Sequence, residues 1–157
     1  MRRILFRGKA INLNNGSKDF VFGQYVQNRN GKFIYTDTWE EGINKYQVIE
    51  KTVGQYTGLT DINGIEIYEG DIVKAMYRIK YKEDYVLGTV VFENGTFKLA
   101  VVGTAKKGEF TLIASSIENY KKTSMYALEN NFIFRGYSLE VIGNIHDNPE
   151  LLKGGEE

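Results

Sequence analysis

The sequence predicts a mainly β fold, and three observations support this. Short runs rich in Val, Ile, Tyr and Phe recur along the chain, separated by Asn-Gly pairs or single glycines, which is typical of β-hairpins and small barrels. The 17 glycines against one proline indicate many turns without a Pro-rich linker. At 157 residues, the chain has the usual size of a single domain with one substantial core.

The N-terminal part predicts a hairpin preceded by a strand. We expect the first strand at 3–10 and the hairpin strands at 20–27 and 32–36, because each run is rich in β-branched and aromatic residues. Between the hairpin strands, Asn28-Arg29-Asn30-Gly31 supplies residue types that favour turns.

The middle of the chain predicts a three-stranded meander. Residues 85–93 and 96–102 flank Asn94-Gly95, which suits the two positive φ angles of a type I′ turn. Residues 72–82 alternate in polarity and predict the preceding strand. A last strand is expected at 139–145, followed by a short helical turn with Asn148 as its N-cap and Pro149 as its first residue.

The stretch GQYTGLTDINGIEIYEGDIV at 54–73 combines glycines with carboxylates. An EF-hand calcium loop needs glycine at its sixth position and glutamate at its twelfth, but counting from Asp61 the glycine is fourth, at Gly64, and the twelfth residue is Ile72. Asp at the first position and Gly at the fourth predict a β-turn, and Gly70 predicts a second turn before the next strand.

A metal-dependent hydrolase is the less favoured alternative for the same stretch. Its carboxylates could gather around magnesium only if the two turns folded together, and they are Asp61, Glu66, Glu69 and Asp71. There is no cysteine and only one histidine, so we assign no catalytic residue, no metal ligand and no cofactor.

The charge balance and the lack of cysteine restrict the cellular location and the classes of binding partner that the sequence favours. Twenty basic and twenty acidic residues cancel, which does not favour a general nucleic-acid or membrane-surface binder. The apolar run near the N-terminus is too short for a signal peptide, and no apolar segment is long enough to span a membrane. With no cysteine for a disulfide framework, we expect a cytoplasmic protein.

One predicted strand carries a basic stripe. Alternation along 72–82 places four cations on one face: Lys74, Arg78, Lys80 and Lys82. Such a stripe could track a nucleic-acid backbone, or it could be a solvated face whose charges keep an edge strand from aggregating. The second interpretation is favoured, because the aromatic residues of this strand alternate onto the other face and so cannot stack bases between the cations.

Four blocks of sequence resemble the YopX family of phage and prophage proteins. They occur in the family's order: MRRILFRGKAI at the start, VGQYTGLTDINGIEIYEGDIVK at 53–74, GTVVFENGTFKL at 88–99 and LEVIGNIHDNPELL at 139–152. The resemblance covers most of the recognisable core, whereas 103–138 match poorly. It implies a predominantly β protein with an SH3-like small-barrel core, made in a bacterial cytoplasm from a phage or an integrated element.

The resemblance also suggests how the chain is divided. We expect a single YopX-like domain over 1–157, with N-terminal strands and a hairpin (1–53), the barrel core (54–102), a variable insertion (103–138) and a closing strand with its C-terminal turn (139–152). The family has no established catalytic residues to transfer. The positions that match its motif are expected to be structural: Gln55, Tyr56, Thr57, Gly58, Asp61, Gly64, Tyr68, Gly70 and Asp71.

Two functional hypotheses follow from the sequence. The first is a non-enzymatic phage accessory protein that binds a host or phage protein or assembles with itself, since 21 aromatic residues in a neutral chain provide material for an interface. The alternative is a nucleic-acid-binding small-barrel protein that uses the basic stripe in phage replication or host takeover. No membrane partner is expected.

Overall fold

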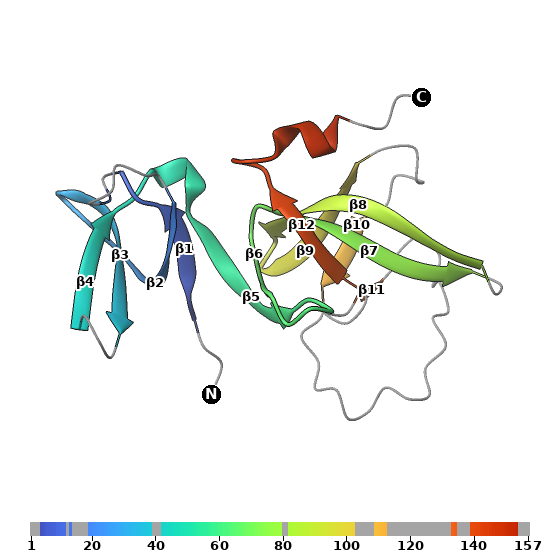
Figure 1. Cartoon of the computed structure of the whole chain (residues 1–157), viewed down its shortest axis with the longest axis horizontal. Coiled ribbons are helices and arrows are strands. Elements are labelled where there is room, and N and C mark those ends of the chain that lie inside the picture. Colours follow the sequence, from blue (N-terminus) through green and yellow to red (C-terminus); the bar gives the residue numbers. More distant parts are fainter. Residues whose placement is uncertain are drawn as a thin grey trace. The chain divides into compact units, whose positions relative to one another are not determined.

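The computed structural model describes residues 4–11, 13, 19–38, 42–79, 82–102, 109–112, 133–134 and 139–153. The chain divides into two compact units, Met1–Gly58 and Leu59–Glu157. Both are built from β-strands, with two short 3-10 helices as the helical elements of the described part (Figure 1). The mainly β fold expected from the sequence is confirmed.

The first unit is a meander with a returning strand. Its elements are β1 (Phe6–Lys9), β2 (Phe20–Asn28), β3 (Gly31–Thr38), β4 (Gly42–Gln47), the 3-10 helix η1 (Glu50–Thr52) and most of β5 (Gly54–Thr60). The hydrogen-bonded order is β4-β3-β2-β1-β5, and all these pairs are antiparallel. The first half of β2 pairs with β1 and its second half pairs with β3.

Backbone contacts also connect the end of β4 with the end of β1. Ala10 and Val48 form an isolated antiparallel bridge. On either side of it, the Ile11 amide donates to the Gln47 carbonyl at 2.8 Å and the Ile49 amide donates to the Lys9 carbonyl at 2.9 Å. Ala10, Ile34 and Val48 are buried, so this contact lies at the apolar interior of the unit.

The second unit repeats the same strand order. After β6 (Glu66–Tyr68), its strands are β7 (Asp71–Ile79), β8 (Lys82–Glu93), β9 (Thr96–Val102), β10 (Glu109–Leu112), β11 (Ile133–Phe134) and β12 (Leu139–Asn144), and η4 (Pro149–Leu152) follows. The order β10-β9-β8-β7-β12 matches that of the first unit, because β12 returns antiparallel beside β7. The pair of β10 with β11 is parallel.

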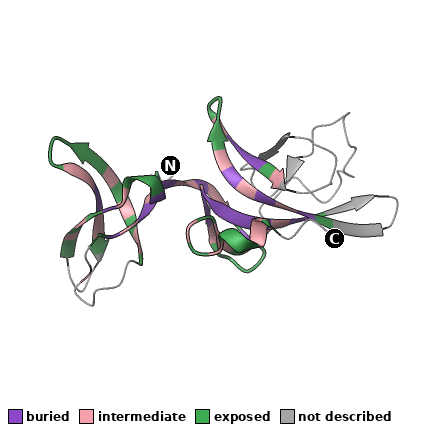
Figure 2. Cartoon of the chain, turned by 90° about the horizontal axis from the view of Figure 1, so that it is seen from above, coloured by how far each residue is buried: buried purple, intermediate pink, exposed green. Residues whose placement is uncertain are grey.

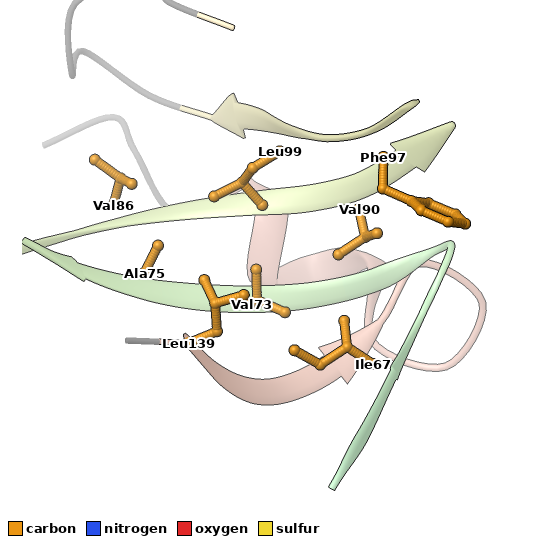
Figure 3. Close-up of a cluster of buried hydrophobic side chains, with 8 residues drawn as sticks. All are labelled: Ile67, Val73, Ala75, Val86, Val90, Phe97, Leu99 and Leu139. Carbon is orange, nitrogen blue, oxygen red and sulfur yellow. The ribbon is translucent and has the colours of Figure 1, made fainter. Parts of the chain in front are cut away.

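One face of the second sheet holds the main core. Eight buried side chains point toward one another from five strands (Figure 3), and they are Ile67, Val73, Ala75, Val86, Val90, Phe97, Leu99 and Leu139. The register explains the grouping, since Ala75 pairs with both Leu139 and Val86, and Val90 pairs with Leu99. In Figure 2 buried stretches lie along the strands, and exposed residues occur at turns and also within strands such as β4.

Several expected elements are confirmed. Asn28 pairs with Gly31 across the first hairpin. At the second hairpin, Asn94 and Gly95 have φ angles of 52° and 79°, as the predicted turn requires. The helical turn at Pro149 is also present, but Asn148 does not cap it, because its side chain accepts a hydrogen bond from the Asn144 amide instead.

The structure also corrects the strand assignment. The strands β4, β5 and β6 were not predicted: β4 and β5 begin with glycine and contain polar residues that resemble turn segments, and β6 has only three residues. The strand expected at 72–82 ends at Ile79, and the next strand begins at Lys82. The pairings among the described strands form two open sheets without a closed barrel. In this same part of the chain, no helix has the length and apolar character needed to cross a membrane.

Candidate interaction surfaces

The family-motif aspartate, Asp61, organises a turn and attaches it to a distant strand. One carboxylate oxygen, Oδ1, accepts from the Asn63 and Ile65 amides at 2.8 and 2.9 Å. The other oxygen, Oδ2, accepts from the Val141 amide at 3.0 Å, across 80 positions of the sequence. The Gly64 amide donates to the Asp61 carbonyl at 3.0 Å and Gly64 has a φ of 82°, so the predicted β-turn is confirmed.

The environment of Asp61 favours its ionised form. The residue is only 5% exposed, and burial on its own raises the pKa of the carboxyl group. The hydrogen bonds from the amides of Val141, Ile65 and Asn63 act in the opposite direction and outweigh burial, so the pKa is lowered from its ordinary value. The negative charge of Asp61 is therefore part of how the second unit holds together.

The second motif turn, at 68–71, is also structural. Asp71 is 1% exposed, and its Oδ2 accepts from the Tyr68 amide at 2.7 Å. Gly70, with a φ of 84°, donates its amide to the Val90 carbonyl and accepts from the Ile145 amide. The turn thereby connects β8 with the residue that follows β12.

The remaining motif residues lie in β5. Gln55 pairs with Phe6 of β1, and the Tyr56 amide donates to the Leu5 carbonyl at 2.8 Å. Thr57 is buried, and Gly58 has a φ of 86°, a conformation that glycine adopts at little cost. These positions support the strand and its bend.

The carboxylates of the stretch do not gather around a common point. Asp61 and Asp71 accept backbone amides of different turns, and the Tyr68 hydroxyl donates to Glu66 at 2.6 Å. Across the residues for which the structure gives positions, no group of three or more acidic, histidine or cysteine side chains is arranged to hold a metal ion.

The basic stripe is only partly assembled. Lys74 and Arg78 belong to β7, Lys80 lies outside the described residues, and Lys82 belongs to β8. Lys82 pairs with Ile79, and paired residues lie on the same face of the sheet. Ile79 and Lys74 belong to opposite faces of β7, so the position of Lys82 is not on the face of Lys74. The prediction of four cations on one face was wrong at Lys82, because the strand is shorter than its polarity pattern indicated.

The face that bears Lys74 also contains an aromatic ring, which comes from the neighbouring strand β8. Tyr85 of β8 pairs with Met76 of β7, and the ammonium of Lys74 lies 4.6 Å from the centre of the Tyr85 ring. Tyr85 is 52% exposed. The expectation of a basic face without aromatic residues was therefore wrong, because the neighbouring strand supplies the ring.

A hollow of about 290 Å³ lies in the first unit, at the end of the β2–β3 hairpin (strands labelled in Figure 1). The residues that line it come from the hairpin, from the end of β4 and from η1, and they are Gln27, Asn28, Arg29, Gly31, Lys32, Gln47, Val48 and Glu50. Below, this site is called the hairpin hollow. Sequence reasoning missed it, because its parts are separated along the chain and have no motif.

Pairing between strands explains why these residues meet. Gln27 pairs with Lys32, and the Val48 amide donates to the Lys32 carbonyl at 3.0 Å, so β2, β3 and the residue that follows β4 supply one row of the lining. Lys32 and Glu50 form an ion pair. The hydrogen bond with Glu50 is the largest influence on the pKa of Lys32 and raises it, so the lysine stays charged.

A family model and a solved structure match this chain. A family model described as "YopX protein" matches residues 17–153, which extend over both units. The crystal structure of protein EF1440 from Enterococcus faecalis is similar, with 21% sequence identity over 97% of this chain and 99% of that chain and a TM-score of 0.48. A search of curated proteins gave no match.

Proposed function

Because this chain belongs to the YopX family, we propose that it is a non-enzymatic protein-binding module that acts as a phage or prophage accessory protein in a bacterial cytoplasm. We place its partner site at the hairpin hollow. The observation that carries the proposal is the lining of this hollow, in which side-chain amides and charged groups surround a buried valine.

The chemistry of the hollow favours recognition over catalysis. Gln27, Asn28 and Gln47 offer amide donors and acceptors, and the ion pair of Lys32 with Glu50 satisfies both of its charges. Among the described lining residues there is no hydroxyl, thiol or imidazole that could act as a nucleophile or as a base near neutral pH. A partner would therefore be bound and not chemically changed.

We further propose that the first unit has the arrangement of an SH3-like small barrel. The support is its five-stranded order, the division of β2 between two partner strands, and the 3-10 helix between β4 and β5. The bridge between Ala10 and Val48 adds a contact from β4 back to β1. The proposal moves the barrel core from 54–102, where the sequence had suggested it, to the first unit.

The test is partner retention in a prophage-bearing bacterial host. The tagged full-length protein is compared with a variant carrying Gln27→Leu and Gln47→Leu, and with the control Gln24→Leu, which changes the same residue type on β2 outside the hollow. Cross-linked partners are quantified by mass spectrometry, and thermal unfolding checks that each variant is folded. We expect the same partner with wild type and control, and its loss with the double variant. Equal recovery with all three proteins would contradict the proposed site.

Nucleic-acid binding is the second candidate, and the contact of Lys74 with Tyr85 favours it. A cation beside an exposed ring is the combination that single-strand binders use. If Lys74, Arg78 and Lys80 each contact a phosphate, affinity for single strands should fall with salt with a log-log slope of about −2, from about −0.7 per contact. Exchanging Arg78 and Lys80 for Glu should flatten this slope.

We expect this test to show no strong binding of nucleic acid. The chain has no net charge, and Tyr85 is the one aromatic ring that the described residues place on the face that bears Lys74. Binding to DNA or RNA should therefore be weaker than about 10 μM near physiological salt. Submicromolar binding that the double reversal abolishes would favour the nucleic-acid function over the protein-binding one.

A further inference from the structure

The shape of the hairpin hollow depends on a set of local contacts that fix its walls. The Asn30 amide donates to Asn28 Oδ1 at 2.8 Å and thereby stabilises the hairpin turn. Gly31 has a φ of 131°, and a Cβ atom at this position would lie 3.0 Å from Nε2 of Gln47. The side chain of Gln47 therefore occupies space that only glycine leaves open.

The side-chain amide of Gln27 suits a polypeptide backbone as its ligand. The Tyr25 hydroxyl donates to Gln27 Oε1 at 3.3 Å, which leaves the amide nitrogen of Gln27 as a donor to a ligand. Gln47 of β4 also lines the hollow, but it pairs with Phe33 whereas Gln27 pairs with Lys32, so the two side chains leave opposite faces of the strands. A peptide group has one donor and one acceptor, the complement of a side-chain amide, so a short extended segment can pair with Gln27.

The charges of the hollow are not balanced. Lys32 and Glu50 neutralise each other, while Arg29 is exposed at the hairpin tip and forms no ion pair among the described residues. Arginine in this setting favours a carboxylate, which it can bind through two parallel hydrogen bonds. The lining is therefore suited to a ligand with at least one negative charge.

We propose that the hairpin hollow binds an extended, acidic peptide segment of a partner protein. The side-chain amide of Gln27 pairs with its main chain, and Arg29 pairs with an Asp or Glu side chain of the segment. This inference rests on the proposed protein-binding function and adds the chemical class of the ligand. The volume of about 290 Å³ is near the lower end of ligand pockets, which suits a short segment and not a folded surface.

Two other ligands fit the lining less well. Proline-rich segments are recognised by grooves lined with aromatic rings, and the described residues that line the hollow include none. Single-stranded nucleic acid needs rings for base stacking, which the described lining residues do not supply. Both alternatives are included in the experiment as competing probes.

The experiment selects ligands from a random linear peptide library on the immobilised full-length protein. Peptides that the wild type enriches are synthesised, and their affinities are measured by fluorescence anisotropy. A proline-rich peptide and a single-stranded oligonucleotide serve as competitors. We expect the enriched peptides to share an Asp or Glu, and neither competitor to displace them.

Variants then test the assigned contacts. Arg29→Glu should weaken binding by at least about tenfold, because it replaces an attractive charge pair by a repulsive one. Lys153→Glu makes the same change of net charge in the second unit and should change affinity by less than about twofold. Arg29 is exposed at a turn, so its exchange should not affect folding.

The possible results separate the two proposals. Enriched peptides without acidic residues, displacement by the proline-rich peptide or the oligonucleotide, equal effects of Arg29→Glu and Lys153→Glu, or no enrichment at all would each overturn the acidic-peptide assignment. If the glutamine variant still loses a partner in the host cell, protein binding at the hollow stands and only the ligand class was wrong. If that variant loses no partner, the proposed function itself fails.

Discussion

Removing the Asp61 side chain should strongly destabilise the second unit. Asp61→Ala deletes three hydrogen bonds to a buried, ionised acceptor. The amides of Asn63 and Ile65 belong to exposed residues and can bind water instead, whereas the Val141 amide lies in a strand beside the core. Since a hydrogen bond to a charged group contributes about 1.5–3 kcal/mol and a hydrated one about 1 kcal/mol or less, we expect a loss of about 3–5 kcal/mol in the free energy of unfolding.

Asp61→Asn tests the hydrogen bond to the Val141 amide of β12 apart from the two hydrogen bonds within the turn. Asparagine has one carbonyl oxygen that can keep the two turn amides, but its nitrogen then faces the Val141 amide, and two donors cannot bond to each other. We expect a loss of about 1.5–3 kcal/mol. Asp37→Ala changes an exposed aspartate of the first unit and is the control, with an expected effect below about 0.5 kcal/mol.

Urea unfolding and hydrogen exchange measure separately the loss of stability and the loss of the hydrogen bond from the Val141 amide. Urea unfolding gives the free-energy differences, and amide exchange reports the protection of Val141 directly. Both Asp61 variants should exchange faster at Val141 than the wild type and the control. A loss below about 1 kcal/mol for Asp61→Ala, or unchanged exchange at Val141, would refute the structural role of the carboxylate.

The lowered pKa of Asp61 predicts a pH dependence with a definite sign. Because the folded pKa lies below the unfolded one, the unfolded state binds the proton more readily at acidic pH. The stabilisation is therefore fully present above the ordinary aspartate pKa of about 3.9 and is lost as the pH falls through the folded value. The difference in stability between wild type and Asp61→Asn should be constant from pH 6 to about 5 and should shrink below about pH 4. A difference that stays constant on acidification would contradict the assignment.

Three further predictions concern the hairpins and metal. Gly88→Ala should destabilise the protein by about 1–3 kcal/mol in urea unfolding, because the new Cβ would lie 2.7 Å from Cγ of Leu99 and 2.8 Å from the carbonyl oxygen of Ala100. Gly95→Val should lower the free energy of unfolding by about 1–2 kcal/mol. The added Cβ meets no atom within 4 Å, so the cost comes from the φ of 79° alone. Gly95→Asn should cost less, and equal melting temperatures of the two variants would refute this reason. EDTA should leave the melting temperature unchanged, and a drop that magnesium or calcium reverses would support a metal site.

The sequence by itself determined the local structure of this protein. Asn94-Gly95 specifies its turn because few residues adopt positive φ angles, and Asp61 with Gly64 specifies another because the aspartate side chain accepts nearby amides. The mainly β fold follows from the repetition of such turns between β-branched and aromatic runs. These interactions join residues close in sequence, so their pattern is visible without coordinates.

Only the tertiary structure decided which distant residues share a surface. The bond from Val141 to Asp61 crosses most of the second unit, and the ring of Tyr85 reaches Lys74 from a neighbouring strand. Alternation within one strand shows which of its residues share a face, but strand length and register decide which side chains of the neighbouring strand lie on that same face. For this reason the face that bears Lys74 does not include Lys82, as had been predicted, and does include Tyr85. For the same reason the hairpin hollow has no motif in the sequence.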